Sequence, residues 1–160
     1  MESRNVVLRK EGDARGYYER CSAETEIPEL SRFFTMLSED EVRHDDALRA
    51  LQNGARVELA HSTTLDSARY ILRHLSVQDA ALAKFNGDLA TYGCAMDFEA
   101  ASVRLCGQLA RDAEHKWEKE LYLKIAAEDE MHFTLLEHMR ELLEPAFCAD
   151  RGTDGVSDAF

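Results

Sequence analysis

Two acid-x-x-His pairs combine residue types that bind metal ions in proteins. Glu41 precedes His44 by three residues, and Asp129 precedes His132 by three residues. Residues three apart on a helix lie on the same face, so each pair would present a carboxylate and an imidazole to one point. Carboxylate oxygens with one imidazole per metal suit non-haem iron, with manganese as the second choice.

This spacing alone is not specific, because the chain has 31 acidic residues and six histidines. Two further pairs, Glu58/His61 and Asp112/His115, have the same spacing but fall in a predicted connection and near a predicted turn. We interpret these two pairs as the background rate of the pattern.

The first two pairs differ from this background because two glutamates lie in register with them. Glu11 precedes Glu41 by 30 residues, and Glu99 precedes Asp129 by 30 residues. A shift of 88 residues places Glu11 on Glu99, Glu41 on Asp129 and His44 on His132. Elsewhere the two halves are about as different as unrelated sequences, so internal duplication is a hypothesis that only the ligand and core positions support.

Apolar residues recur at spacings of three and four along most of the chain, which predicts an all-α fold. Pro28 predicts the first turn of a helix, Asn53-Gly54 predicts a helix end, and Pro145 predicts another helix end. The expected long helices cover residues of about 5–26, 28–53, 88–111 and 116–144. Between the second and third, we expect a helix over about 64–75 and another that begins at Ser76.

The six polar residues interrupt the apolar stripes of these four helices. The predicted turn near residue 26 lies midway between Glu11 and Glu41, and the one near residue 114 lies midway between Glu99 and Asp129. Two antiparallel hairpins would therefore place the four carboxylates at the same height along the bundle. Burying four carboxylates without Lys or Arg on the same stripe costs several kcal/mol each unless the charge is compensated. Two divalent cations would supply that compensation, and a water-filled polar core is the alternative. The candidate metal ligands are Glu11, Glu41, His44, Glu99, Asp129 and His132.

We divide the chain into a helical bundle, residues 1–145, and a flexible C-terminal tail, residues 146–160. The net charge of -12 argues against a nucleic-acid partner. No apolar stretch is long enough for a membrane helix and no secretory signal is recognisable, so we expect a cytoplasmic protein. Four cysteines without C-x-x-C spacing predict reduced, mostly buried thiols, and no zinc ribbon.

The remaining aromatic and imidazole side chains have simpler interpretations. We expect the histidines outside the register on the surface, and we expect four of the tyrosines to be packing residues. These histidines are His61, His74, His115 and His138, and the tyrosines are Tyr17, Tyr18, Tyr92 and Tyr122.

One glutamate from each of two helices and an acid-x-x-His box from each of the other two resemble the ferritin-like di-iron carboxylate bundle, specifically the rubrerythrin family. The segment Glu11–Tyr18 resembles the first ligand helix of that family, and Leu37–His44 and Ala127–Phe133 resemble its two ligand boxes. The resemblance covers residues 5–144.

The resemblance implies a ferritin-like four-helix bundle of two antiparallel hairpins joined by a long helical crossover. It also implies two iron ions, with manganese as the alternative, where Glu41 and Asp129 bridge, Glu11 and Glu99 cap, and each histidine binds one ion. The implied activity is that of an oxidoreductase that reacts with peroxide or dioxygen. Electrons would come from a separate donor protein because no rubredoxin domain follows, and we expect a homodimer.

Three positions depart from the family pattern. Asp129 stands where the family usually has glutamate, Cys106 stands where an aromatic residue usually follows the ligand, and no second carboxylate accompanies Glu99. Three alternatives therefore stay open beside a peroxidase: an iron-storage or encapsulated mini-ferritin protein with Fe(II) as substrate, a hydroxylase, and a metal-free helical interaction module.

Overall fold

The structure is a computed structural model that describes the backbone of residues 2–75 and 89–153 and the side chains of residues 2–75 and 92–142. All regular secondary structure in these ranges is helical, which confirms the all-α prediction. None of the described helices combines the length and apolar character needed to cross a membrane. The helices are α1 (Glu2–Glu24), α2 (Pro28–Gln52), α3 (Thr64–His74), α4 (Leu89–Asp112) and α5 (Lys116–Thr153).

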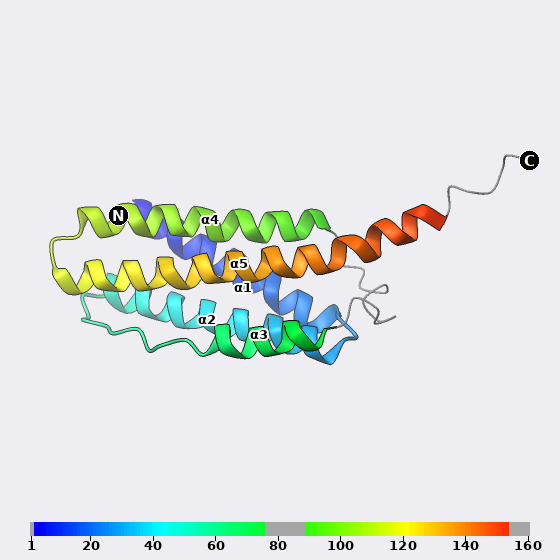
Figure 1. The fold of residues 1–160 in the computed structure, drawn as a ribbon. Coiled ribbons are helices and arrows are strands. Elements are labelled where there is room, and N and C mark those ends of the chain that lie inside the picture. Colours follow the sequence, from blue (N-terminus) through cyan, green and yellow to red (C-terminus); the bar gives the residue numbers. More distant parts are fainter. Residues whose placement is uncertain (1, 76–88, 154–160) are drawn as a thin grey trace, which may run out of the picture.

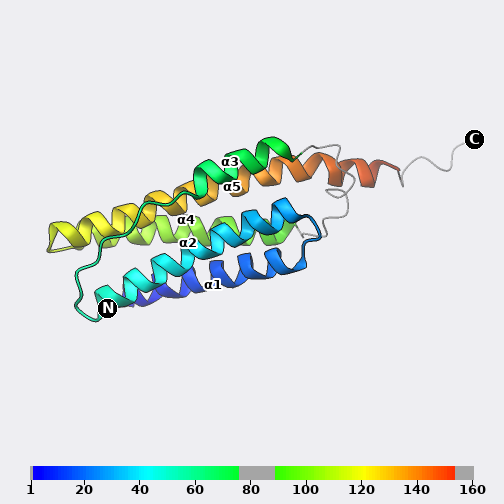
Figure 2. The same ribbon diagram turned by 90° about the horizontal axis from the view of Figure 1, so that it is seen from below.

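The four long helices lie side by side, and α3 lies along the outside of α2 and α5 (Figures 1 and 2). Helices α1 and α2 pack against each other across the turn at residues 25–27, and α4 and α5 do so across the turn at 113–115. These two turns lie at opposite ends of the molecule (Figure 1). Helix α1 also packs against α4, which joins the two pairs.

The ends of α2 follow the signals in its sequence. Pro28 occupies the first turn, where its missing N–H removes no intrahelical hydrogen bond. At the other end Asn53 is the C-cap, and its backbone N–H donates to the carbonyl of Arg49 at 3.1 Å. Gly54 follows with a φ of 79°, a left-handed conformation in which glycine avoids the steric cost of a Cβ. The expected boundaries of this helix are therefore confirmed.

The structure tests the predicted short helices between α2 and α4 and the predicted end of the last helix. The short helix expected near residues 64–75 is present as α3, whereas the one expected from Ser76 lies outside the described residues. The prediction that Pro145 ends the last helix is wrong, because α5 continues to Thr153 and so includes the first part of the predicted tail. A proline removes one intrahelical hydrogen bond, but the turns beyond it can still form their own.

The buried apolar residues form two clusters, one toward each end of the long helices. The first includes Leu30, Phe33 and Leu37 of α2 together with Leu136 and Met139 of α5. The second includes Leu48 and Leu51 of α2 together with Leu121 and Ile125 of α5. Because α2 and α5 each contribute to both clusters, a central layer of each helix lies between two apolar cores.

The apolar clusters should carry the stability of the fold. Leu30 is fully buried, so Leu30→Ala should lower the free energy of unfolding by about 2–5 kcal/mol through lost burial and the cavity that remains. Leu123 is 47% exposed, so the matched change Leu123→Ala should cost less than about 0.5 kcal/mol. Urea denaturation of the metal-free protein measures both values, and equal losses would contradict this assignment of the core.

Candidate metal centre

Six ionisable side chains from four helices meet in the layer between the two apolar clusters. Each is at most 1% exposed. They are Glu11 on α1, Glu41 and His44 on α2, Glu99 on α4, and Asp129 and His132 on α5. The structure thus brings together every residue that the sequence register singled out.

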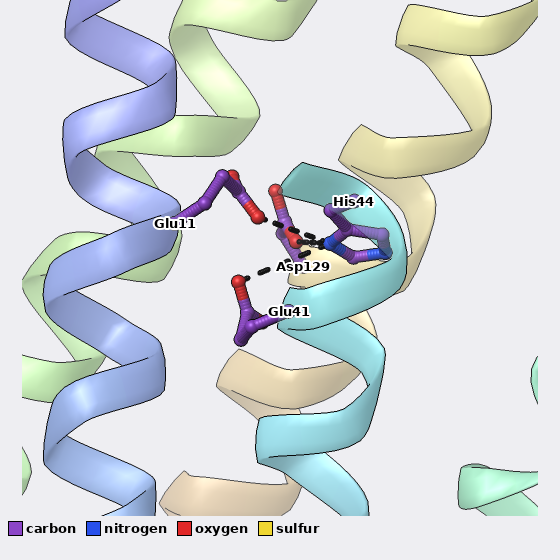
Figure 3. A group of neighbouring side chains, drawn as sticks. All are labelled: Glu11, Glu41, His44 and Asp129. Atoms are coloured by element: carbon purple, nitrogen blue, oxygen red, sulfur yellow. Dashed lines mark hydrogen bonds and ion pairs between the residues drawn. The ribbon is translucent and has the colours of Figure 1, made fainter. Parts of the chain in front are cut away.

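The six residues form two overlapping groups, each with the geometry to hold a metal ion. Glu11 and His44 belong to one group, Glu99 and His132 to the other, and Glu41 and Asp129 to both. Within each group, one ligand atom per residue lies within 4.8 Å of the others. In the first group the carboxylates of Glu11, Glu41 and Asp129 converge on the ring of His44 (Figure 3).

Both imidazoles turn Nδ1 toward the carboxylates. His44 Nδ1 lies 3.1 Å from Glu11 Oε2 and 3.2 Å from Asp129 Oδ1. His132 Nδ1 lies 2.9 Å from Glu41 Oε1 and 3.3 Å from Glu99 Oε1. The two rings stack at an interplanar angle of 25°, with centroids 5.9 Å apart.

Burial and repulsion from neighbouring carboxylates raise the pKa of Glu41 and of Asp129. Burial, and then the charges of Glu11 and Glu99, raise the pKa of Glu41 well above its ordinary value. Burial and the charge of Glu11 raise the pKa of Asp129 to about 7. For both histidines burial lowers the pKa, but the surrounding carboxylates outweigh it and raise the pKa. Without metal, protons thus neutralise part of the site's negative charge.

Several inner atoms have no hydrogen bond within the described part of the chain, although they are buried. These are Glu41 Oε1, both carboxylate oxygens of Asp129, and His132 Nδ1. Glu41 Oε1 and His132 Nδ1 lie 2.9 Å apart, and Asp129 Oδ1 lies 3.2 Å from His44 Nδ1, but these contacts lack hydrogen-bond geometry. Buried polar atoms without a hydrogen bond cost free energy, and natural proteins rarely retain several together. All four atoms belong to groups that can converge on a cation, so the donor set fits a metal site.

The sequence analysis missed two carboxylates that contact the outer edge of the imidazoles. Asp40 Oδ2 lies 3.0 Å from Nε2 of His132, and Glu128 Oε2 lies 2.7 Å from Nε2 of His44. A carboxylate on the far nitrogen of a histidine fixes the ring and its tautomer for metal binding. The signal was available, because Asp40 and Glu128 are also 88 residues apart and each directly precedes a predicted ligand.

Glu11 and Glu99 have different hydrogen-bond donors. Tyr18 donates its hydroxyl proton to Glu99 Oε1, while Ser102 donates to Glu11 Oε1 at 2.5 Å. The prediction that Tyr18 is only a packing residue is therefore incomplete. Cys106 lies beyond Ser102, with its Sγ 4.0 Å from the serine hydroxyl, and burial raises the pKa of its thiol. The two halves of the site are thus not chemically equivalent.

Residues outside the register behave as expected or nearly so. All four remaining histidines are exposed, as are Glu58 and Asp112, so the two background pairs form no buried site. Of the three cysteines whose side chains are described, all are free thiols, but only Cys106 is buried. The expectation of mostly buried cysteines is therefore wrong for the exposed Cys94, whereas Cys21 is half-buried against the first apolar cluster.

Comparison with known proteins gave no family model, no curated protein and no solved structure that matches this chain. The interpretation of the site rests on its own residues.

The protonation of the inner groups predicts an unusual pH dependence for the metal-free protein. Between the ordinary pKa of 3.8 and about 7, folded Asp129 holds a proton that the unfolded chain releases. The free energy of unfolding must therefore fall as pH rises through this range, and the raised histidine pKa values continue the trend above 6.5. Thermal unfolding of metal-free protein should give a lower melting temperature at pH ~8 than at pH ~5.

Asp129→Asn provides the control for this pH dependence. The amide does not titrate, so the decrease in melting temperature with pH should be smaller in this variant than in the parent protein. A melting temperature that rises with pH in the parent, or an unchanged slope in the variant, would show that Asp129 is not a strained buried acid.

Proposed function

We propose that this chain is a non-haem di-iron protein of the ferritin-like, rubrerythrin-like type, which reacts with peroxide or dioxygen. The observation that carries the proposal is the convergence of four buried carboxylates and two buried imidazoles into two overlapping ligand groups. The same proposal includes a ferritin-like four-helix bundle, with α1–α2 and α4–α5 as antiparallel hairpins and the segment that contains α3 as the crossover.

The donor set supports iron as the resident metal and suggests the role of each ligand. The six inner ligands supply only carboxylate oxygen and imidazole nitrogen, which favours iron, with manganese as the alternative. Glu41 and Asp129 belong to both groups, which supports bridging roles for them. Glu11 and Glu99 each belong to one group and would cap one ion, together with the histidine of that group.

The surrounding residues would prepare the site for redox chemistry. When bound, the two ferrous ions would supply the two electrons that reduce peroxide to water. The apolar clusters on both sides would limit access of bulk water, and Asp40 and Glu128 would hold the imidazoles in their binding orientation. Tyr18 would hold Glu99 through its hydroxyl hydrogen bond.

The stoichiometry of metal binding depends on the inner ligands. After anaerobic loading with Fe(II), the protein should retain two ions per chain, and Glu41→Ala or His132→Ala should abolish this stoichiometry because each removes a member of a ligand group. Both variants should also lower the melting temperature of the loaded protein. Elemental analysis after gel filtration measures the metal content.

The exposed residue His61 provides the control for the ligand variants. His61→Ala should retain the full metal content and the parent melting temperature. Equal behaviour of all three variants would refute the proposed ligands.

The reaction can be tested in a single turnover of the ferrous protein. One peroxide should disappear for about every two ferrous ions, since two electrons and two protons convert hydrogen peroxide to two waters. Stopped-flow absorbance under anaerobic conditions follows the oxidation of iron, with Glu41→Ala as the inactive control. Continued oxidation of Fe(II) beyond two ions per chain would instead indicate iron storage. If peroxide does not oxidise the bound Fe(II), the proposed reaction with peroxide is wrong. A parent protein that binds no metal would instead indicate a metal-free interaction module.

A further inference from the structure

Arg43 connects the two outer carboxylates of the site. One nitrogen of its guanidinium group, Nη2, lies 2.7 Å from Asp40 Oδ1 and 2.8 Å from Glu128 Oε2. The other, Nη1, donates to the backbone carbonyl of Ala60 at 2.8 Å. The side chain is 30% exposed, so it lies at the boundary between the buried site and solvent.

These contacts complete a continuous chain of polar groups between the two imidazoles. It runs from His132 through Asp40, Arg43 and Glu128 to His44, and every contact along it measures 2.7–3.0 Å. The path lies on the Nε2 side of both rings, opposite the carboxylates that face Nδ1. It is therefore separate from the inner connection through Glu41 and Asp129.

The segment between α2 and α3 holds the same network in place. The hydroxyl of Ser62 donates to both carboxylate oxygens of Asp40, at 3.1 and 2.9 Å. With the contact between Arg43 and the Ala60 carbonyl, this ties the connecting segment to the outer carboxylates at two points. Asp40 is 4% exposed, so its orientation depends on these partners rather than on water.

We propose that Arg43 is a positioning residue that holds both histidines for metal binding at once, by fixing Asp40 and Glu128 together. This inference rests on the proposed metal site. A planar guanidinium can bind two carboxylates in a fixed geometry, whereas an ammonium acts as a compact point charge. Without Arg43, the two outer carboxylates repel each other and lose their orientation, and both imidazoles lose their fixed tautomer.

Titration with Co(II) tests whether one outer residue controls both positions. Arg43→Met should weaken binding at both cobalt positions by about 10–100-fold, the usual effect of losing an outer-shell partner. Arg43→Lys keeps the charge and should give an intermediate loss. The matched control is Arg49→Met, because Arg49 lies on the same helix and contacts Asp45 at 2.7 Å, away from the inner ligands. The control should match the parent protein.

Nitrogen-15 NMR of the Zn(II)-loaded protein separates positioning from general stability. In the parent, both histidines should show a slowly exchanging Nε2 proton. His132 should donate it in a hydrogen bond to Asp40, and His44 should donate it to Glu128. Arg43→Met and Arg43→Lys should shift or broaden both signals. Asp40→Asn should affect mainly that of His132, which it contacts directly.

Each unfavourable outcome has a distinct meaning. If the parent binds two cobalt ions and both Arg43 variants bind them as tightly, or lose only one, the positioning role is wrong and the metal site stands. If the Arg43 variants only have a lower melting temperature, with both Nε2 signals unchanged, Arg43 contributes to stability alone and the inference is again wrong. If the parent itself binds no cobalt or zinc, the proposed function fails and the inference fails with it.

Discussion

The desolvation of four carboxylates in one layer is the constraint on which the rest of this structure depends. Glu11, Glu41, Glu99 and Asp129 are at most 1% exposed, and the described residues offer them only two imidazoles as potential cations in direct contact. Such burial is costly unless protons or metal ions neutralise the charge. The raised pKa of Glu41 and of Asp129 expresses this cost in the metal-free state.

The arrangement of the helices makes this layer possible. Each long helix runs from one apolar cluster through the polar layer to the other cluster. Along α2, Leu37 lies in the first cluster, Glu41 and His44 lie in the polar layer, and Leu48 lies in the second cluster. Burial of the apolar clusters favours folding, and burial of the charged groups in the polar layer opposes it. On the Nε2 side of the imidazoles, Asp40 and Glu128 contact the two rings, and Arg43 links these carboxylates at the boundary with solvent.

The sequence predicted the inner site well because spacing is preserved when helices pack as hairpins. A separation of 30 residues within each half brought Glu11 to Glu41 and Glu99 to Asp129, and three-residue spacing put each histidine on the face of its carboxylate.

The outer residues were harder to predict. Asp40 and Glu128 lie at the flank of the apolar stripe, and whether such a residue turns inward depends on a partner from another helix, here His132 and His44. The sequence predicts Tyr18 as a packing residue because an aromatic ring suits a core, and only the fold places its hydroxyl on Glu99. The end of α5 was also missed, since a proline disfavours a helix without forbidding it.

The most direct test of the central claim is anomalous diffraction at the iron edge from crystals of the iron-loaded protein. The account predicts two anomalous peaks per chain within the layer, one between Glu11 and His44 and one between Glu99 and His132, with Glu41 and Asp129 between the peaks. Crystals grown from iron-loaded protein that show waters or no peaks among these six residues would contradict it.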